Sequence, residues 1–275
     1  MLRCVFSVVF ATAVTVLAGD KNAYVSSIED WRQQREAKLK AEDGWLSLAG
    51  LFWLQEGTNT VGSKAGSLVQ LPEGFPVNTG AFVRHGNAVT YKGKPLKTDK
   101  SGDPDVIPIG RLRLYVIERG TKLGVRMKDP KSKARTDFKG LQWFRVKPEW
   151  RINARFVPQP KHITVDAQAG DKQEYESPGY IEWERAGKTV RLTPVREDDQ
   201  LFFIFRDATA GKSTYSAARF IYTELPKDGH VLIDFNKAYN PPCVFTPYAT
   251  CPLPPAENRV RIPVEAGEKM YVGHP

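Results

Sequence analysis

The sequence predicts a mainly β protein made of two packed β-sandwich or barrel-like halves, with one N-terminal helix and an irregular, proline-rich C-terminal segment. Short apolar runs recur between turn signals along most of the chain, which is typical of strands. The 22 glycines and 20 prolines indicate many turns. The 275 residues, 41% hydrophobic and 26% charged, are enough to bury a real core.

The first residues have the pattern of a secretory signal peptide. Arg3 precedes an apolar run from Cys4 to Leu17, and Val16-Leu17-Ala18 has the small-residue pattern of a cleavage site. The run is shorter than the roughly 20 residues that a membrane-spanning helix needs. We therefore expect residues 1–18 to be removed, and the protein to be secreted or periplasmic without a stable membrane anchor.

Residues 19–43 are expected to contain the N-terminal helix. The helical pattern covers Ser27 to Ala41, where Ser27 can cap the first turn and Glu29 and Asp30 carry its negative charge. Gly44 then ends the helix.

Residues 44–148 are expected to form the first β half. A buried strand or turn pair at Gly44 to Leu54 contains two tryptophans, and Arg111 to Ile117 alternates between polar and apolar residues as a half-buried strand does. The layout from Gly57 to Arg126 is faintly similar to a forkhead-associated β-sandwich, but the Arg and Ser of phosphothreonine recognition cannot be placed. Further strands are expected at Ser67 to Leu71, Ala81 to Arg84, Ala88 to Tyr91, Leu112 to Glu118 and Leu123 to Met127.

Residues 149–275 are expected to form the second β half, beginning after a soft boundary near residue 148. Pro158-Gln159-Pro160 interrupts its first strands, and the tail from Asn240 is rich in proline and expected to be irregular. The expected strands are Ile152 to Val157, His162 to Val165, Tyr180 to Glu184, Thr189 to Leu192, Leu201 to Phe205, Thr214 to Ile221 and Val231 to Phe235.

The formal net charge of +9 raises the question of an anionic partner. The basic residues are scattered among 31 acidic ones, which indicates a solvated surface rather than a nucleic-acid groove. A small polar or anionic ligand is therefore the expected partner, and nucleic acid is not. The histidines share no metal-binding spacing, no cofactor motif is present, and the sequence carries no signal for an oligomeric state.

Two polar clusters follow predicted strands. Arg126 and Asp129 can form a binding clamp or a structural ion pair at a strand end. Asp207 and Thr209 are expected to accept hydrogen bonds from backbone donors in a hairpin turn, with Gly211 in an unusual backbone conformation and Arg219 nearby. The run Gly211-Lys212-Ser213-Thr214 is not a phosphate loop, because Arg206 stands where the first glycine of that motif belongs.

The third polar cluster is the most distinctive segment of the chain. It carries Asp234, Asn236 and Asn240 into a loop stiffened by prolines. Cys243 and Cys251 are expected to form a disulfide, worth about 2.5 kcal/mol for so short a ring. Such a rigid loop suits a preorganised site, but Asp and Asn also satisfy orphan backbone groups.

These residues resemble the bacterial family called domain of unknown function 1684. The resemblance rests on the Asp-Phe-Asn-x-Ala-Tyr-Asn-Pro-Pro-Cys signature at Asp234 to Cys243 and on similar elements elsewhere. Those elements are Gly44 to Leu51, Phe138 to Leu141, Asp207 to Tyr215, Tyr248 to Pro255, Glu257 to Arg259 and Ala266 to Lys269. Val260 departs from an expected Leu, which is close in volume. The family has no assigned activity, so the resemblance supports fold and location and transfers no catalytic role.

Two functions are compatible with the sequence. The first is an exported binding or scaffold protein, whose ligand residues would be Arg126, Asp207, Arg219, Asn258 and Arg259. The second is an exported hydrolase-type enzyme, with Asp234 as general base or ligand oriented by Asn236 and Asn240. Convergence of these side chains with Asp207 or Arg126 on an open cleft would favour the enzyme. Side chains turned onto the neighbouring backbone would leave that function without support.

Overall fold

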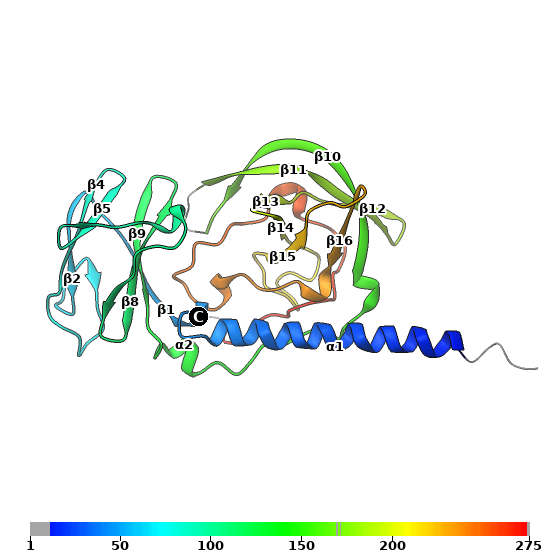
Figure 1. Cartoon of the computed structure of the whole chain (residues 1–275), viewed down its shortest axis with the longest axis horizontal. Helices are drawn as coiled ribbons and strands as arrows, with labels where there is room; N and C mark the ends of the chain where they lie inside the picture. Colours follow the sequence, from blue (N-terminus) through cyan, green and yellow to red (C-terminus); the bar gives the residue numbers. More distant parts are fainter. Residues whose placement is uncertain (1–11, 169, 171, 274–275) are drawn as a thin grey trace, which may run out of the picture.

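The computed structural model describes residues 12–168, 170 and 172–273, and it shows a mainly β protein with several packed sheets and one long N-terminal helix. Helix α1 (Thr12–Lys40) runs along one side of the strands, and its C-terminal end reaches the place where the two groups of sheets meet (Figure 1). Residues 1–11 of the expected signal peptide lie outside the described residues. The structure thus confirms the predicted fold class.

Two sheets are built from strands before residue 129, and their strands pair antiparallel except for β2 and β3, which pair in parallel. The first has the order β1-β9-β8-β7 and the second the order β3-β2-β4-β5-β6. Along β8, Leu112 and Leu114 are fully buried while Arg113 is exposed, which confirms the predicted alternation. The strands are β1 (Leu48–Trp53), β2 (Gly57–Gly62), β3 (Val69–Gln70), β4 (Gly80–His85), β5 (Ala88–Tyr91), β6 (Lys94–Pro95), β7 (Ile107–Ile109), β8 (Leu112–Arg119) and β9 (Lys122–Lys128).

Two further antiparallel sheets are built from strands after residue 150. They have the orders β12-β11-β10-β16 and β13-β14-β15. A short helix, α2 (Lys133–Thr136), lies on the connection to them. The strands are β10 (Arg151–Asp166), β11 (Lys172–Arg185), β12 (Lys188–Leu192), β13 (Val195–Glu197), β14 (Gln200–Phe205), β15 (Arg219–Glu224) and β16 (His230–Asp234).

The sheet of β13, β14 and β15 is buried on both faces. Phe203 and Phe205 on β14 pack in one core with residues of the neighbouring sheet. Phe202 and Ile204 point the other way, into a second core shared with helix α1 and the C-terminal segment. This explains the unbroken apolar run of β14, because a strand covered on both sides has no solvent face. The irregular C-terminal segment therefore completes the core rather than trailing from it.

Three predicted elements need correction. The helix begins at or before Thr12, so Ser27 lies in its interior, where its hydroxyl donates to the Tyr24 carbonyl at 2.7 Å instead of capping. Strand β10 continues through Pro158 and Pro160 with a register shift. Both prolines are tolerated because pairing of β10 with β16 ends at Arg155. Beyond that residue no strand of the described part of the chain lies on that side of β10 to accept a backbone N–H, so proline, which has none, loses no hydrogen bond.

The third correction concerns the turn after β14. Strand β15 begins only at Arg219, because Thr214 belongs to the turn, where its hydroxyl lies 2.7 Å from that of Thr209. The predicted roles of Asp207 and Gly211 are confirmed: Asp207 accepts from the Thr209 backbone N–H at 2.8 Å, and Gly211 has a φ of +75°. The Thr209 hydroxyl instead bonds side chains, those of Asp207 at 2.6 Å and Thr214 at 2.7 Å. The predicted hairpin is therefore present, with a longer turn and a shorter second strand.

A fully buried ion pair holds this turn to the C-terminal segment. The Arg219 side chain is 1% exposed, and its Nη2 donates to Asp207 Oδ2 at 2.6 Å. The same guanidinium donates to the carbonyls of Val264 and Ala266, at 2.8 and 2.5 Å. The geometry gives Asp207 and Arg219 a structural role, because both side chains are 1% exposed and paired with each other.

Substitution Asp207→Asn is expected to lower the free energy of unfolding by about 3 kcal/mol, since it leaves a buried guanidinium without a counter-charge. Urea unfolding measures the change. Lys161→Gln removes an exposed ion pair with Glu257 at 3.1 Å and is expected to cost less than about 1 kcal/mol. Equal losses in the two variants would contradict the structural importance of the buried pair.

Candidate functional site

The carboxylate and first amide of the signature segment are directed at helix α1. The Tyr24 hydroxyl donates to Asp234, 3.0 Å from Oδ1 and 2.9 Å from Oδ2. Asn236 is fully buried; it donates to the Tyr24 hydroxyl at 3.0 Å and exchanges two hydrogen bonds with the backbone of Lys147. Burial and the neighbouring Asp234 carboxylate raise the pKa of the Tyr24 hydroxyl. These side chains anchor the helix.

The second amide of the segment anchors the same helix further along. Asn240 Nδ2 donates to Glu268 Oε1 at 2.8 Å and to the Lys269 carbonyl at 2.7 Å. Glu268 is 0% exposed, and its Oε2 lies 3.5 Å from Arg35 Nε on the helix. Arg35 also donates to the Asn240 carbonyl at 2.9 Å. Gly267 must be glycine here, because a Cβ would lie 2.4 Å from the Ala238 carbonyl oxygen.

The predicted catalytic cluster is thus turned onto backbone and helix. Asp234, Asn236 and Asn240 do not converge with Asp207 or Arg126 on an open cleft. Of two other predicted ligand residues, only Asn258 is turned onto the backbone. Asn258 is 1% exposed and hydrogen-bonds the backbone of Thr193 and Ile204, while Arg259 is exposed at the surface.

Arg126 is the predicted ligand residue that the structure places at a cavity. It does not pair with Asp129, which instead accepts two hydrogen bonds from Arg111, at 2.8 and 2.9 Å. In an extended strand, residues an odd number of positions apart point to opposite faces, so Arg126 and Asp129 diverge. The predicted pair of Arg126 and Asp129 is therefore wrong, and the ion pair at this strand end is between Arg111 and Asp129.

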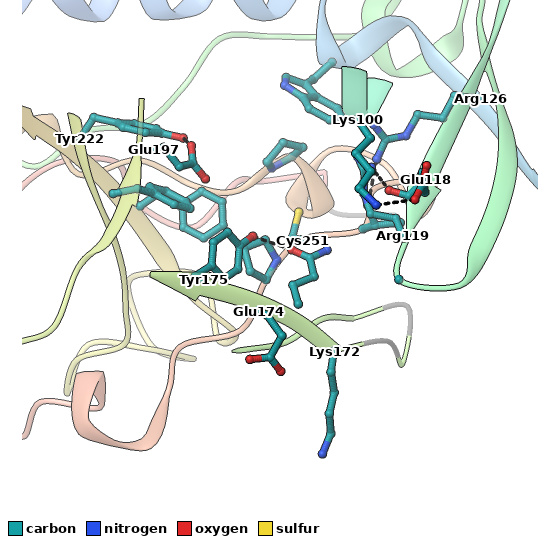
Figure 2. A pocket seen from close by; sticks show the side chains of 18 of the residues that line it. Lys100, Glu118, Arg119, Arg126, Lys172, Glu174, Tyr175, Glu197, Tyr222 and Cys251 are labelled. Atoms are coloured by element: carbon teal, nitrogen blue, oxygen red, sulfur yellow. Dashed lines mark hydrogen bonds and ion pairs between the residues drawn. The ribbon is translucent and has the colours of Figure 1, made fainter. Parts of the chain in front are cut away.

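A cavity of about 940 Å³ lies between the two groups of sheets. Figure 2 shows Lys100, Glu118, Arg119 and Arg126 on one side of it, Tyr222 and Glu197 on the other, and Cys251 between them. The lining comes from helix α1, from β8 and β9 of the first group, and from β11 and β13 to β15 of the second. The size is that of small-molecule sites in proteins, which span about 300–1,000 Å³.

Two guanidinium groups meet on one hydroxyl at the basic side of the cavity. Arg126 Nη2 and Arg119 Nε donate to Thr250 Oγ1, at 3.0 and 3.1 Å. Arg119 is neutralised by Asp99, which accepts from it at 2.8 and 3.1 Å. Arg126 differs: it is 4% exposed, its hydrogen bonds go to neutral hydroxyls of Thr250 and Tyr115, and its Nε has no hydrogen-bond partner in the described part of the chain.

The opposite side of the cavity is aromatic. Phe202 stacks on Tyr222 with ring centroids 4.6 Å apart and meets Phe220 edge-on at 4.9 Å. The Tyr222 hydroxyl donates to Glu197 Oε2 at 2.6 Å. Burial and that hydrogen bond raise the pKa of the Tyr222 hydroxyl, so it remains a neutral donor at physiological pH.

The two cysteines are free and adjacent beside this cavity. The Cys243 backbone N–H donates to Cys251 Sγ at 3.2 Å, and both residues are buried. Hydrogen bonds from Cys251 and Tyr215 lower the pKa of the Cys243 thiol, while the neighbouring Cys243 and burial raise that of Cys251. Residues 12–168, 170 and 172–273 show no group of three or more His, Cys, Asp or Glu side chains placed to hold a metal ion.

The structure and the cavity together define a mainly β protein with a charged and aromatic cavity between two groups of sheets. Residues 136–269 match the family described as protein of unknown function (DUF1684), and this part of the chain belongs to that family. The matched range includes the signature segment but begins after Gly44 to Leu51. In the described part of the chain, no helix has the length and apolar character needed to cross a membrane.

The solved structures similar to this chain include the solution NMR structure of an uncharacterised protein from Haloarcula marismortui. The two sequences are 30% identical over 51% of this chain and 81% of the other, with a TM-score of 0.41. No curated protein matches the chain.

Glu268 gives a pH-dependent prediction. Burial raises the pKa of its carboxyl, so the folded protein holds that proton to a higher pH than the unfolded chain, in which a Glu titrates near about 4.3. The stability that protonated Glu268 contributes is therefore fully present below about pH 4.3 and is lost as the pH rises through the folded pKa. In Glu268→Gln this position does not titrate, so the variant does not lose this stability as the pH rises.

Urea unfolding of both proteins from pH 4 to 8 measures the effect. The free energy of unfolding of wild type minus that of Glu268→Gln is expected to fall as the pH rises above about 4.3 and to level off once the pH exceeds the folded pKa. A difference that stays constant, or that rises with pH, would contradict the raised pKa.

Proposed function

We propose that this protein binds a small organic anion in the cavity between the two groups of sheets, with the acidic group of the ligand held by Arg126 beside Arg119. The observation that carries the proposal is the buried Arg126 guanidinium, whose recorded hydrogen bonds go only to neutral hydroxyls and whose Nε lacks a partner within the described residues.

The electrostatic argument starts from the charge of arginine. A guanidinium stays protonated in proteins, so burial cannot neutralise it as it can a lysine. A buried charge is costly unless a partner compensates it. Asp99 compensates Arg119, which leaves the Arg126 charge available to an anion. A carboxylate fits the planar donor array of this side chain.

The hydrolase alternative has weaker support. A general base needs an accessible position near a reacting group. Asp234 instead accepts from Tyr24 and from the backbone N–H of Asn236, and Asn236 and Asn240 are fully buried. A binding protein needs none of these side chains to be free, so the geometry favours binding.

We further propose that the protein is exported and that Cys243 and Cys251 form a disulfide in the oxidising compartment. The hydrogen bond between the two thiols and that from the Cys243 backbone N–H to Cys251 Sγ at 3.2 Å support this, because they hold the sulfur atoms near each other. The apolar N-terminal run supports export.

The anion proposal predicts binding of alkanoates, with butyrate to octanoate as probes and the matching neutral amides as comparators. Isothermal titration calorimetry should show that the carboxylates bind and the amides do not. Arg126→Met should weaken carboxylate binding about tenfold or more, since it removes a charge-assisted interaction. Its melting temperature should stay equal or rise, because an uncompensated buried charge is removed.

The matched control is Arg191→Gln, which removes one positive charge from an exposed position outside the cavity lining. It should leave carboxylate binding unchanged. Equal affinity of carboxylates and amides, or full affinity in a folded Arg126→Met protein, would contradict the proposal.

The export proposal predicts a mature N-terminus at Gly19 or Asp20 and a closed disulfide after expression with export. Mass spectrometry after iodoacetamide treatment of the denatured protein should show no alkylated cysteine before reduction and two after it. Alkylation of both cysteines without reductant, or an intact N-terminus in exported protein, would contradict it.

A further inference from the structure

The side of the cavity opposite Arg126 is an aromatic wall. Phe202, Phe220 and Tyr222 form a continuous aromatic surface through their ring contacts, and Tyr175 and Tyr239 extend it around the cavity. Tyr222 is 39% exposed, so its ring is open on the side not covered by Phe202. Such a surface can pack against the apolar body of a ligand and attract a positive charge to its ring faces.

An acidic side chain stands at the edge of this wall. Glu197, at the end of β13, is half-buried and accepts a hydrogen bond at 2.6 Å from a neutral hydroxyl, that of Tyr222. The two other acidic side chains of the cavity lining are engaged differently. Glu118 pairs with Lys100 at 2.6 Å, and Glu174 accepts from the Thr164 hydroxyl at 2.7 Å and points away from the cavity in Figure 2.

The cavity is therefore polarised. Arg126 and Arg119 stand on one side, and the Glu197 carboxylate and the aromatic rings stand on the other, with the residues around Cys251 between them (Figure 2). A ligand with an acidic group alone would satisfy the first side and leave the second unused.

We propose that Glu197 and the aromatic wall of Phe202, Tyr175 and Tyr222 form a second subsite, which takes the ammonium end of a zwitterionic ligand whose acidic end lies at Arg126. This inference rests on the proposed function and specifies its ligand class: an amino acid or related zwitterion whose charged ends are separated by an apolar spacer. An α-amino acid does not fit this arrangement, because its two charged groups are attached to the same carbon and no spacer separates them.

Each part of the subsite has a physical role. The carboxylate of Glu197 attracts the ammonium, and the hydrogen bond from Tyr222 holds that carboxylate in place. The ring faces add a cation–π contribution, which grows where water is excluded. The spacer packs on the apolar rings between the two charged ends.

The test compares ω-amino carboxylates, from 4-aminobutyrate to 8-aminooctanoate, with alkanoates of the same length, by isothermal titration calorimetry. At the length that spans the cavity, the amino acid should bind about five- to tenfold more tightly than its alkanoate. Glu197→Gln, which keeps an acceptor for the Tyr222 hydroxyl, should abolish this gain and leave alkanoate affinity unchanged. Tyr222→Leu, which keeps an apolar side chain but removes the ring, should reduce the gain.

Glu174→Gln is the matched control: it removes a carboxylate of the same cavity lining whose side chain points away, and it should retain the full gain. Unchanged alkanoate binding by Glu197→Gln shows that this variant is folded. If no chain length gains from the ammonium group, or if the gain persists in Glu197→Gln, the second subsite is overturned. Arg126-dependent alkanoate binding would then leave the proposed function standing, whereas its absence would remove both.

Discussion

The docking of helix α1 through buried polar side chains is the constraint on which the arrangement of this protein depends. Tyr24 meets Asp234 and Asn236, and further along the helix Arg35 meets Asn240 and Glu268. Hydrogen bonds between buried polar groups are directional and costly to leave unmade, so they fix the position of the helix along the C-terminal segment. The helix in turn delivers Arg35 and, just beyond its end, Trp45 to the wall of the cavity.

The C-terminal segment transmits this constraint to the rest of the molecule. It covers one face of the β13 to β15 sheet, so that Phe202 and Ile204 share a core with Val244 and Phe245. It also carries Thr250, the hydroxyl on which Arg119 and Arg126 meet. A segment without strands is therefore rigid because helix, sheet and basic residues all hold it, and the cavity inherits that rigidity.

Local pattern was sufficient to predict much of the fold. The alternation along β8 and the roles of Asp207 and Gly211 in the turn depend on neighbours in sequence, and both were predicted correctly. The continuation of β10 through Pro158 could not be predicted, because it depends on where the partner strand β16 stops pairing. Distant contacts decide such cases.

The candidate site was harder to predict, because its residues come from segments far apart in the chain. Asp234, Asn236 and Asn240 attracted attention as a dense polar cluster, but their partners on α1 lie about two hundred residues earlier, and those partners turn the cluster into an anchor. Glu197 and Tyr222 form no local motif with Arg126. Strand alternation can assign a face to each of these residues, but it does not indicate which faces meet across a cavity.

Two buried arginines of this chain, Arg219 and Arg126, show how the presence or absence of a counter-charge distinguishes a structural arginine from a candidate binding residue. Arg219 is enclosed with Asp207 and two backbone carbonyls, so its charge is balanced by the fold itself. Among the described residues the Nε atoms of both arginines lack a hydrogen-bond partner, but Arg126, which is nearly as buried, donates to neutral hydroxyls where Arg219 donates to a carboxylate. A fold that only needed stability would gain from an apolar residue at this position, because an uncompensated charge opposes burial. The proposed anion would supply this missing charge from outside the chain, and the burial of Arg126 is the reason for proposing it.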